Sequence, residues 1–85
     1  MSEEQGILTF RASLLHRLGY TFLLQGRLAE AEQILKEGIA LSSENSFLDE
    51  LAQSHKYLAK VYEAKGDIPA AFEEQSNYLV LNDSL

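Results

Sequence analysis

The stretch EAKGDIPAAFEEQ, residues 63–75, joins two helical patterns at Gly66. Glycine adopts a left-handed backbone conformation without a Cβ clash, which suits it to the end of a helix. Asp67 can cap the helix that follows, and Pro69 is tolerated in its first turn, where N–H groups have no partner inside the helix. The stretch therefore predicts two helices joined by a tight turn at Gly66.

The same pattern occurs forty residues earlier, in LLQGRLAEAEQIL at residues 23–35. That shift places Gly26 on Gly66, and apolar positions agree along the rest of the chain. The matching pairs are Leu8 with Leu48, Leu18 with Leu58, Phe22 with Tyr62, Ala31 with Ala71, and Leu41 with Leu81. A fixed period of this length indicates a repeat protein. We divide the chain into one domain, residues 1–85, with a lead at 1–5 and repeats at 6–45 and 46–85.

Each repeat carries two stripes of apolar residues at helical spacing, and no stretch alternates with the period of a strand. The sequence therefore predicts an all-α fold of four antiparallel helices. Between the repeats, SSENS at 42–46 is the only polar segment long enough to be a loop, and Ser46 with Asp49 resembles a capping box. Small residues stand where paired helices must approach closely, because a large side chain there would overpack the contact. They are Gly19, Ala31, Ala59 and Ala71.

Composition narrows the classes of function. The chain has no cysteine, which excludes disulfides and Cys-based zinc sites. Its net charge of −6 argues against nucleic-acid binding, which needs a basic face. No apolar run approaches the roughly 18 residues of a membrane helix, and the start, MSEEQ, is acidic where a secretory signal would be basic. We expect a soluble, cytoplasmic protein with no membrane or nucleic-acid partner.

Catalytic and metal chemistry find little support. The two histidines, His16 and His55, have no carboxylate three or four residues away and no HExxH motif. Nucleophilic catalysis would need a hydroxyl held by a base and an orienting group, and no such set is evident. Paired glutamates on the second helices fit a solvated helix face better than acid–base work. We expect a non-enzymatic protein with no catalytic residue, cofactor or metal.

The residues resemble those of the tetratricopeptide repeat (TPR) family. Leu18-Gly19 and Leu58-Ala59 match its Leu-Gly/Ala pair; Phe22 and Tyr62 match its aromatic residue, Gly26 and Gly66 its turn glycine, and Ala31 and Ala71 its second small residue. The resemblance implies two helix-turn-helix hairpins stacked as a short right-handed α-solenoid. It also implies a protein or peptide partner. The sequence pattern is similar to that of the TPR arrays in bacterial signalling proteins.

The chain departs from the family pattern in two places. Its repeat has 40 residues, not 34, and the extra residues SFLDEL at 46–51 are expected to lengthen the first helix of the repeat. Gln75 stands where the family has a large apolar residue, so the second half of the last helix is expected to pack less well.

The resemblance also implies a peptide-binding groove on the concave side of the first helix of each repeat. Its expected residues are Ser13, His16, Tyr20, Leu23, Leu24, Gln53, Lys56, Lys60 and Glu63, with Arg17 nearby. Lys56 and Lys60 lie one helical turn apart, so an acidic group of a partner would offset their repulsion. The Asn residues of carboxylate-clamp TPRs are absent, because Tyr20 and Lys60 stand there, which argues against that specific mode.

An alternative function remains open, because both ends of the chain are apolar. Stacked repeats normally need polar capping ends, and about three repeats are needed for independent stability. Either a longer array covers these ends, or the chain is a self-assembling structural element that forms a homo-oligomer. The residues expected to mediate self-association are Ile7, Leu8, Phe10, Leu14, Leu79 and Val80.

Overall fold

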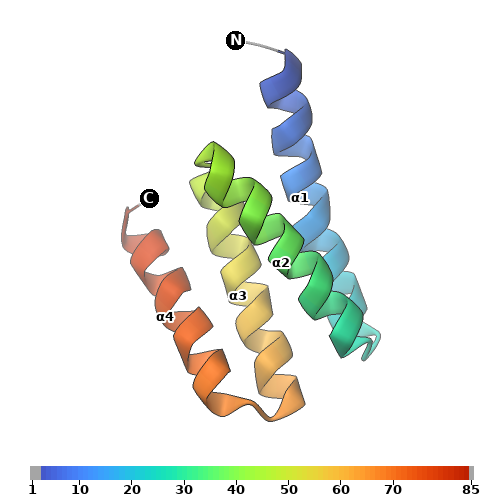
Figure 1. The fold of residues 1–85 in the computed structure, drawn as a ribbon. Helices are drawn as coiled ribbons and strands as arrows, with labels where there is room; N and C mark the ends of the chain where they lie inside the picture. Colours follow the sequence, from blue (N-terminus) through green and yellow to red (C-terminus); the bar gives the residue numbers. More distant parts are fainter. Residues whose placement is uncertain (1–2, 85) are drawn as a thin grey trace.

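Four helices follow one another along the chain and pair as two antiparallel hairpins (Figure 1). In the computed structural model, which describes residues 3–84, they are α1 (Glu3–Leu24), α2 (Leu28–Asn45), α3 (Leu48–Lys65) and α4 (Ile68–Ser84). No strand is present in these residues, so the all-α prediction is confirmed.

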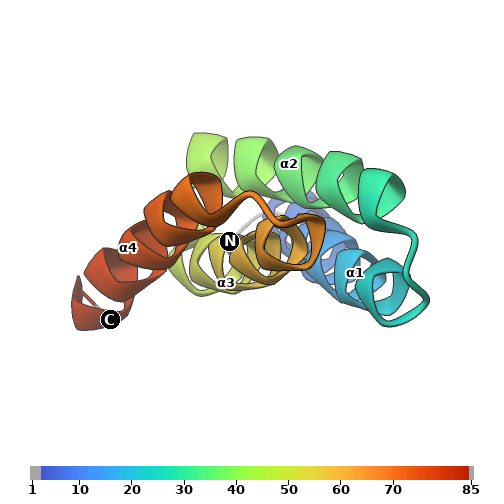
Figure 2. The ribbon, with the colours of Figure 1, turned by 90° about the horizontal axis from the view of Figure 1, so that it is seen from below.

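The central element of the fold is α3, which contacts each of the other three helices. The helices α1 and α3 lie side by side in one layer, and α2 packs across one side of this layer and contacts both helices (Figure 2). Within residues 3–84, α4 contacts α3 alone. The second hairpin therefore has one face that no further helix covers.

All three turns end the preceding helix in the same way. A residue with positive φ stands after each helix: Gly26 at 76°, Ser46 at 58° and Gly66 at 83°. The N–H group of the next residue then donates to a carbonyl five residues back, for example from Asp67 to Tyr62 at 2.9 Å. These bonds satisfy carbonyls that the helix end would leave free. The predicted glycine turns are confirmed.

The two polar predictions for helix starts had different outcomes. The N–H of Ala70 donates to Asp67 Oδ1 at 3.3 Å, so the predicted cap of α4 is present. The predicted capping box at Ser46 is wrong, because Ser46 ends α2 and Phe47, which makes no side-chain cap, precedes α3. The predicted loop at 42–46 is also wrong, since α2 continues through Asn45. The helices α2 and α3 each have 18 residues.

The core lies where α1, α2 and α3 meet. Its buried apolar centre is Ala31, Leu35, Leu58 and Val61, and Phe22, Leu23 and Ile39 are among the residues packed against it. A Cβ added to Gly19 would lie 2.5 Å from Leu35 Cγ, which confirms the close approach predicted there. Ala31, Ala59 and Ala71 are likewise buried. No helix in residues 3–84 is long and apolar enough to span a membrane.

Candidate functional site

The packing of α1 against α3 sets the geometry of the candidate site. The two helices run parallel, because residues further along α1 contact residues further along α3. His16 Nε2 lies 2.8 Å from Glu50 Oε2. One turn further along α1 and about two turns further along α3, the rings of Tyr20 and Tyr57 stack with centroids 4.7 Å apart. We call the side of α1 and α3 opposite α2 the inner face; Arg17, Tyr20, Lys56, Tyr57 and Lys60 contribute to it.

The structure places His16 within the packing of α1 against α3. Only 9% of His16 is exposed, one ring nitrogen is hydrogen-bonded to Glu50, and Nδ1 is buried with no partner. His16 was predicted to contact a ligand in the groove. In the structure the hydrogen bond to Glu50 joins α1 to α3 at this residue.

The other predicted groove residues differ in their access to solvent. Arg17, Tyr20, Leu24, Lys60 and Glu63 are exposed, with Leu24 at 69%. The remaining predicted groove residues are half-buried, and one of them, Leu23, packs against the core. These half-buried residues are Ser13, Leu23, Gln53 and Lys56. Of the exposed polar members, Arg17 and Tyr20 lie on α1, and Lys60 and Glu63 lie on α3.

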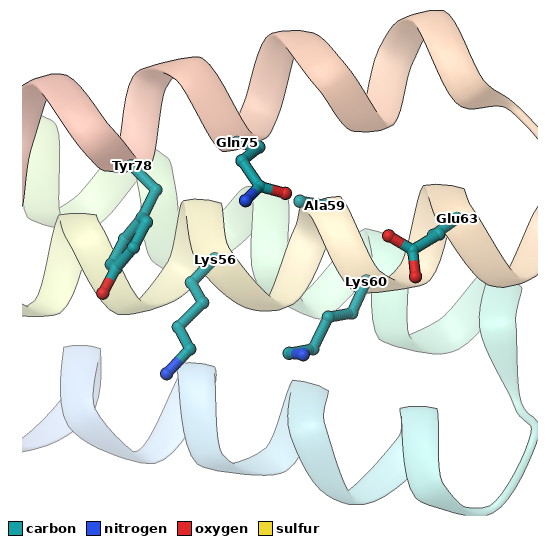
Figure 3. A pocket seen from close by; sticks show the side chains of 6 residues that line it. All are labelled: Lys56, Ala59, Lys60, Glu63, Gln75 and Tyr78. Atoms are coloured by element: carbon teal, nitrogen blue, oxygen red, sulfur yellow. The ribbon is translucent and has the colours of Figure 1, made fainter.

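A hollow of about 130 Å³ opens between α3 and α4. Six residues line it: Lys56, Ala59, Lys60, Glu63, Gln75 and Tyr78. Figure 3 shows Gln75 and Tyr78 projecting from α4 toward α3, while Lys56 and Lys60 extend from α3 toward α1. Gln75 is exposed, as expected for a polar residue in place of a large apolar one, and the hollow lies beside it.

The charges around the hollow are unevenly matched. Lys56 Nζ lies 5.9 Å from the ring centroids of both Tyr57 and Tyr78, a range in which an aromatic face attracts a cation. Lys60 is exposed one turn further along α3, and Glu63 follows on the same wall. This arrangement gives two cations at the start of the hollow and one carboxylate at its far end.

A separate ion network joins α2 to α3 on the side away from the hollow. Glu32 binds Lys65 and Lys36, the latter at 2.9 Å, and Tyr62 Oη donates to Glu32 at 3.2 Å. The hydrogen bonds from Lys65 and then Lys36 lower the pKa of Glu32 from 4.5 to about 2, and burial raises the pKa of Tyr62. The Glu32 carboxylate thus accepts hydrogen bonds from three side chains, two of them on α3.

The match to known families decides the classification. The tetratricopeptide repeat model matches residues 10–75, which is more than half of the chain and includes both hairpin turns, at Gly26 and Gly66. The chain belongs to the tetratricopeptide repeat family. No curated protein and no solved structure matches it.

TPR proteins generally mediate protein–protein interactions and are typically non-enzymatic. In the part of this TPR chain that the structure describes, no group of three or more His, Cys, Asp or Glu side chains could hold a metal ion. The second histidine, His55, pairs with Glu74 and so joins α3 to α4. Both histidines thus make contacts that hold neighbouring helices of the TPR together.

Two apolar faces of the TPR are open to solvent. On α1 the exposed face is Ile7, Phe10, Leu14 and Leu18, and on α4 it includes Ile68, Phe72, Leu79 and Val80. Of the residues predicted to mediate self-association, only Leu8 is half-buried. Apolar residues that recur at helical spacing on one face favour contact with another helix.

Sequence reasoning missed three residues of the site: Tyr57, which stacks on Tyr20, and Gln75 and Tyr78, which line the hollow. A comparison of the two repeats contains a signal for two of them. Forty residues before Gln75 and Tyr78 stand Leu35 and Gly38, so an apolar residue and a glycine of the first repeat are replaced by polar and aromatic side chains. No comparable signal marks Tyr57, because its stacking depends on contact with α1.

Proposed function

We propose that this TPR chain binds a peptide or helix of a partner protein on its inner face. The observation that carries the proposal is the meeting of two exposed or half-buried lysines with stacked aromatic rings beside an open hollow. Aromatic rings supply contact area at little entropic cost, and the lysines favour an acidic group on the partner. The rest of the chain acts as a rigid support, because α3 is fixed by its contacts with the three other helices.

The predicted groove residues would then have different roles. Lys56 and Lys60 attract an acidic residue of the partner, and Tyr20 and Tyr57 provide a flat surface for an apolar or amide group. Arg17 lies exposed on α1 beside them. Leu24, exposed at the end of α1, extends the surface with an apolar contact.

A peptide library displayed on phage tests this proposal. Peptides are selected on the wild-type chain and then measured against the Lys56→Glu/Lys60→Glu variant by calorimetry. We expect their affinity to fall by about tenfold or more, because two attractions become repulsions. Arg11→Glu is the matched control, since Arg11 is exposed on α1 outside the inner-face set. Peptides that bind the double variant as tightly as the wild type would contradict the proposal.

Self-association is the second candidate, and the exposed apolar face of α1 favours it. Ile7 and Phe10 are 66% and 64% exposed on that face. If α1 is a homo-oligomer interface, light scattering will give a mass above the 9.5 kDa of one chain, and Ile7→Glu/Phe10→Glu will restore the monomer without loss of helicity. A wild-type mass of one chain at all concentrations would exclude this function.

A further inference from the structure

The hollow between α3 and α4 has a counterpart in the first repeat. Moving each of its six lining residues back by forty positions gives residues of the α1/α2 pair. The counterparts are His16, Gly19, Tyr20, Leu23, Leu35 and Gly38. Because the two repeats share one packing scheme, these positions show what normally lies over such a surface.

In the first repeat, α3 covers these counterpart positions. His16 binds Glu50 of α3, Tyr20 stacks on Tyr57 of α3, and a Cβ added to Gly38 would lie 3.1 Å from Ser54 Oγ. Leu35 and Leu23 join the core that includes two further residues of α3. The first repeat is therefore complete only with a third helix, and the second repeat has none in residues 3–84.

We propose that the hollow between α3 and α4 receives one amphipathic helix of a partner protein, parallel to α3, with an acidic residue in its first turn that pairs with Lys56. This inference rests on the proposed function and specifies the class of partner and the place where it binds. We call that place, the hollow between α3 and α4, the seat. The template for the partner helix is α3 itself, which lies in the equivalent seat of the first repeat and carries Glu50 in its first turn.

The charges fix the direction of the bound helix. Lys56 stands at the position of His16, so the partner residue opposite it corresponds to Glu50. A carboxylate in the first turn is also favoured by the positive end of the helix dipole. Glu63 lies at the other end of the hollow, where it would attract a basic residue in the last turn of the partner. The α3 helix has this polarity, with Glu50 near its start and Lys65 at its end.

The apolar contacts come from α4. Ile68, Phe72 and Leu79 are 60%, 74% and 52% exposed. Their counterparts on α2 are Leu28 and Ile39, which pack against the core, and Glu32, which binds α3. The exposed residues of α4 thus stand where α2 meets α3. A partner with apolar residues on the facing stripe would cover them and remove that surface from water.

The α1 helix of a second copy of this chain does not match the charges of the seat. If α1 of another copy took the place of the missing helix, Phe10 would stand where Glu50 stands, opposite Lys56. Arg17 would stand where Tyr57 stands, opposite Lys60. That contact leaves Lys56 without a carboxylate and brings two cations together, which is unfavourable. The charges of the seat therefore favour an amphipathic helix with an acidic first turn over α1 of a second copy.

A peptide of residues 48–65 of this chain is the probe, because its sequence already fits an equivalent seat. Labelled with fluorescein, it is titrated with the full chain and followed by anisotropy. We expect Lys56→Glu to weaken binding by about tenfold, and the Glu50→Lys peptide to regain most of that loss on the Lys56→Glu chain, because the ion pair is re-formed in reverse. Arg11→Glu is again the control and should leave the affinity unchanged.

Two variants on α4 locate the peptide. Gln75→Trp fills the hollow and Phe72→Glu removes the most exposed apolar contact; both positions are exposed, so circular dichroism should show an intact fold. Each is expected to reduce affinity by about tenfold or more. Binding unaffected by either variant, or absent charge-swap rescue, overturns the inference.

Different experimental results distinguish a failure of this inference from a failure of the proposed function. If the 48–65 peptide does not bind but library peptides still require Lys56 and Lys60, the inference is wrong and the inner face remains a binding surface. If library peptides also ignore the two lysines, both proposals are wrong. Both proposals are supported if three results are obtained together. The 48–65 peptide binds the wild-type chain, the charge swap restores its affinity, and both α4 variants weaken its binding.

Discussion

Gly19 lies against Leu35 where α1 crosses α2, and the contact leaves no room for a methyl group. The added Cβ would lie 2.5 Å from Leu35 Cγ, and the Leu35 side chain, which would have to shift, is fully buried. We expect Gly19→Ala to lower the free energy of unfolding by about 1–3 kcal/mol, although alanine favours the helix. Urea denaturation measures the change. Gly6→Ala is the control, because nothing lies within 4 Å of its added Cβ, and a similar loss there would contradict the packing argument.

Glu32 is the residue whose protonation affects the fold most clearly. Its carboxyl has a pKa of about 2 in the folded chain against the ordinary 4.5, chiefly because of Lys65 and Lys36. A lowered folded pKa adds stability that is fully present above about pH 4.5 and is lost as the pH falls toward 2. At neutral pH, Glu32→Gln should lower the free energy of unfolding by about 1 kcal/mol, the scale of a partly exposed ion pair.

The same substitution should also flatten the loss of stability between pH 4.5 and pH 2. Urea denaturation at several values of pH checks both effects. Glu44→Gln on the same helix is the control, because Glu44 is exposed and forms no ion pair with another residue of the 3–84 segment. Equal pH dependence of wild type and Glu32→Gln would contradict the assigned role.

At the scale of the elements, the three turns differ in one residue. Gly26 and Gly66 take the left-handed conformation freely, whereas Ser46 takes it with a φ of 58° and a side chain. A residue with a Cβ is disfavoured there by about 1 kcal/mol. We therefore expect Ser46→Gly to raise the free energy of unfolding by up to about 1 kcal/mol, and Gly66→Ser to lower it by a similar amount. Thermal unfolding of both variants measures this, and a loss of stability in Ser46→Gly would be contrary to the account.

The outcome at the turns explains what local sequence could and could not predict. The glycine turns and the Asp67 cap depend on residues within one or two turns of helix, so they were predictable. The end of α2 was not, because Ser42 is fully buried in the fold and the helix continues past it despite a serine-rich sequence. Tertiary packing there overrides the weak helix preference of serine. The capping box failed for the same reason, since the true turn begins at Ser46.

At the scale of the whole molecule, contacts between distant residues decide the site. The helical class and the repeat followed from periodicity, and Lys56 and Lys60 were predicted to lie on one face from their spacing. The burial of His16 was not predictable, because its partner Glu50 lies 34 residues further along the chain. The hollow was likewise hidden, since it requires that α4 contacts α3 and no other helix in residues 3–84.

We propose that the second repeat binds a partner helix in the hollow between α3 and α4, at the edge of the inner face. The measurement that tests it most directly is an NMR titration of the isotope-labelled chain with the 48–65 peptide. We expect the changes in backbone chemical shift to concentrate at Lys56, Ala59, Lys60, Gln75 and Tyr78, and the shifts at the start of α1 to stay unchanged. Shifts confined to the exposed face of α1, or no saturable shift at all, would contradict it.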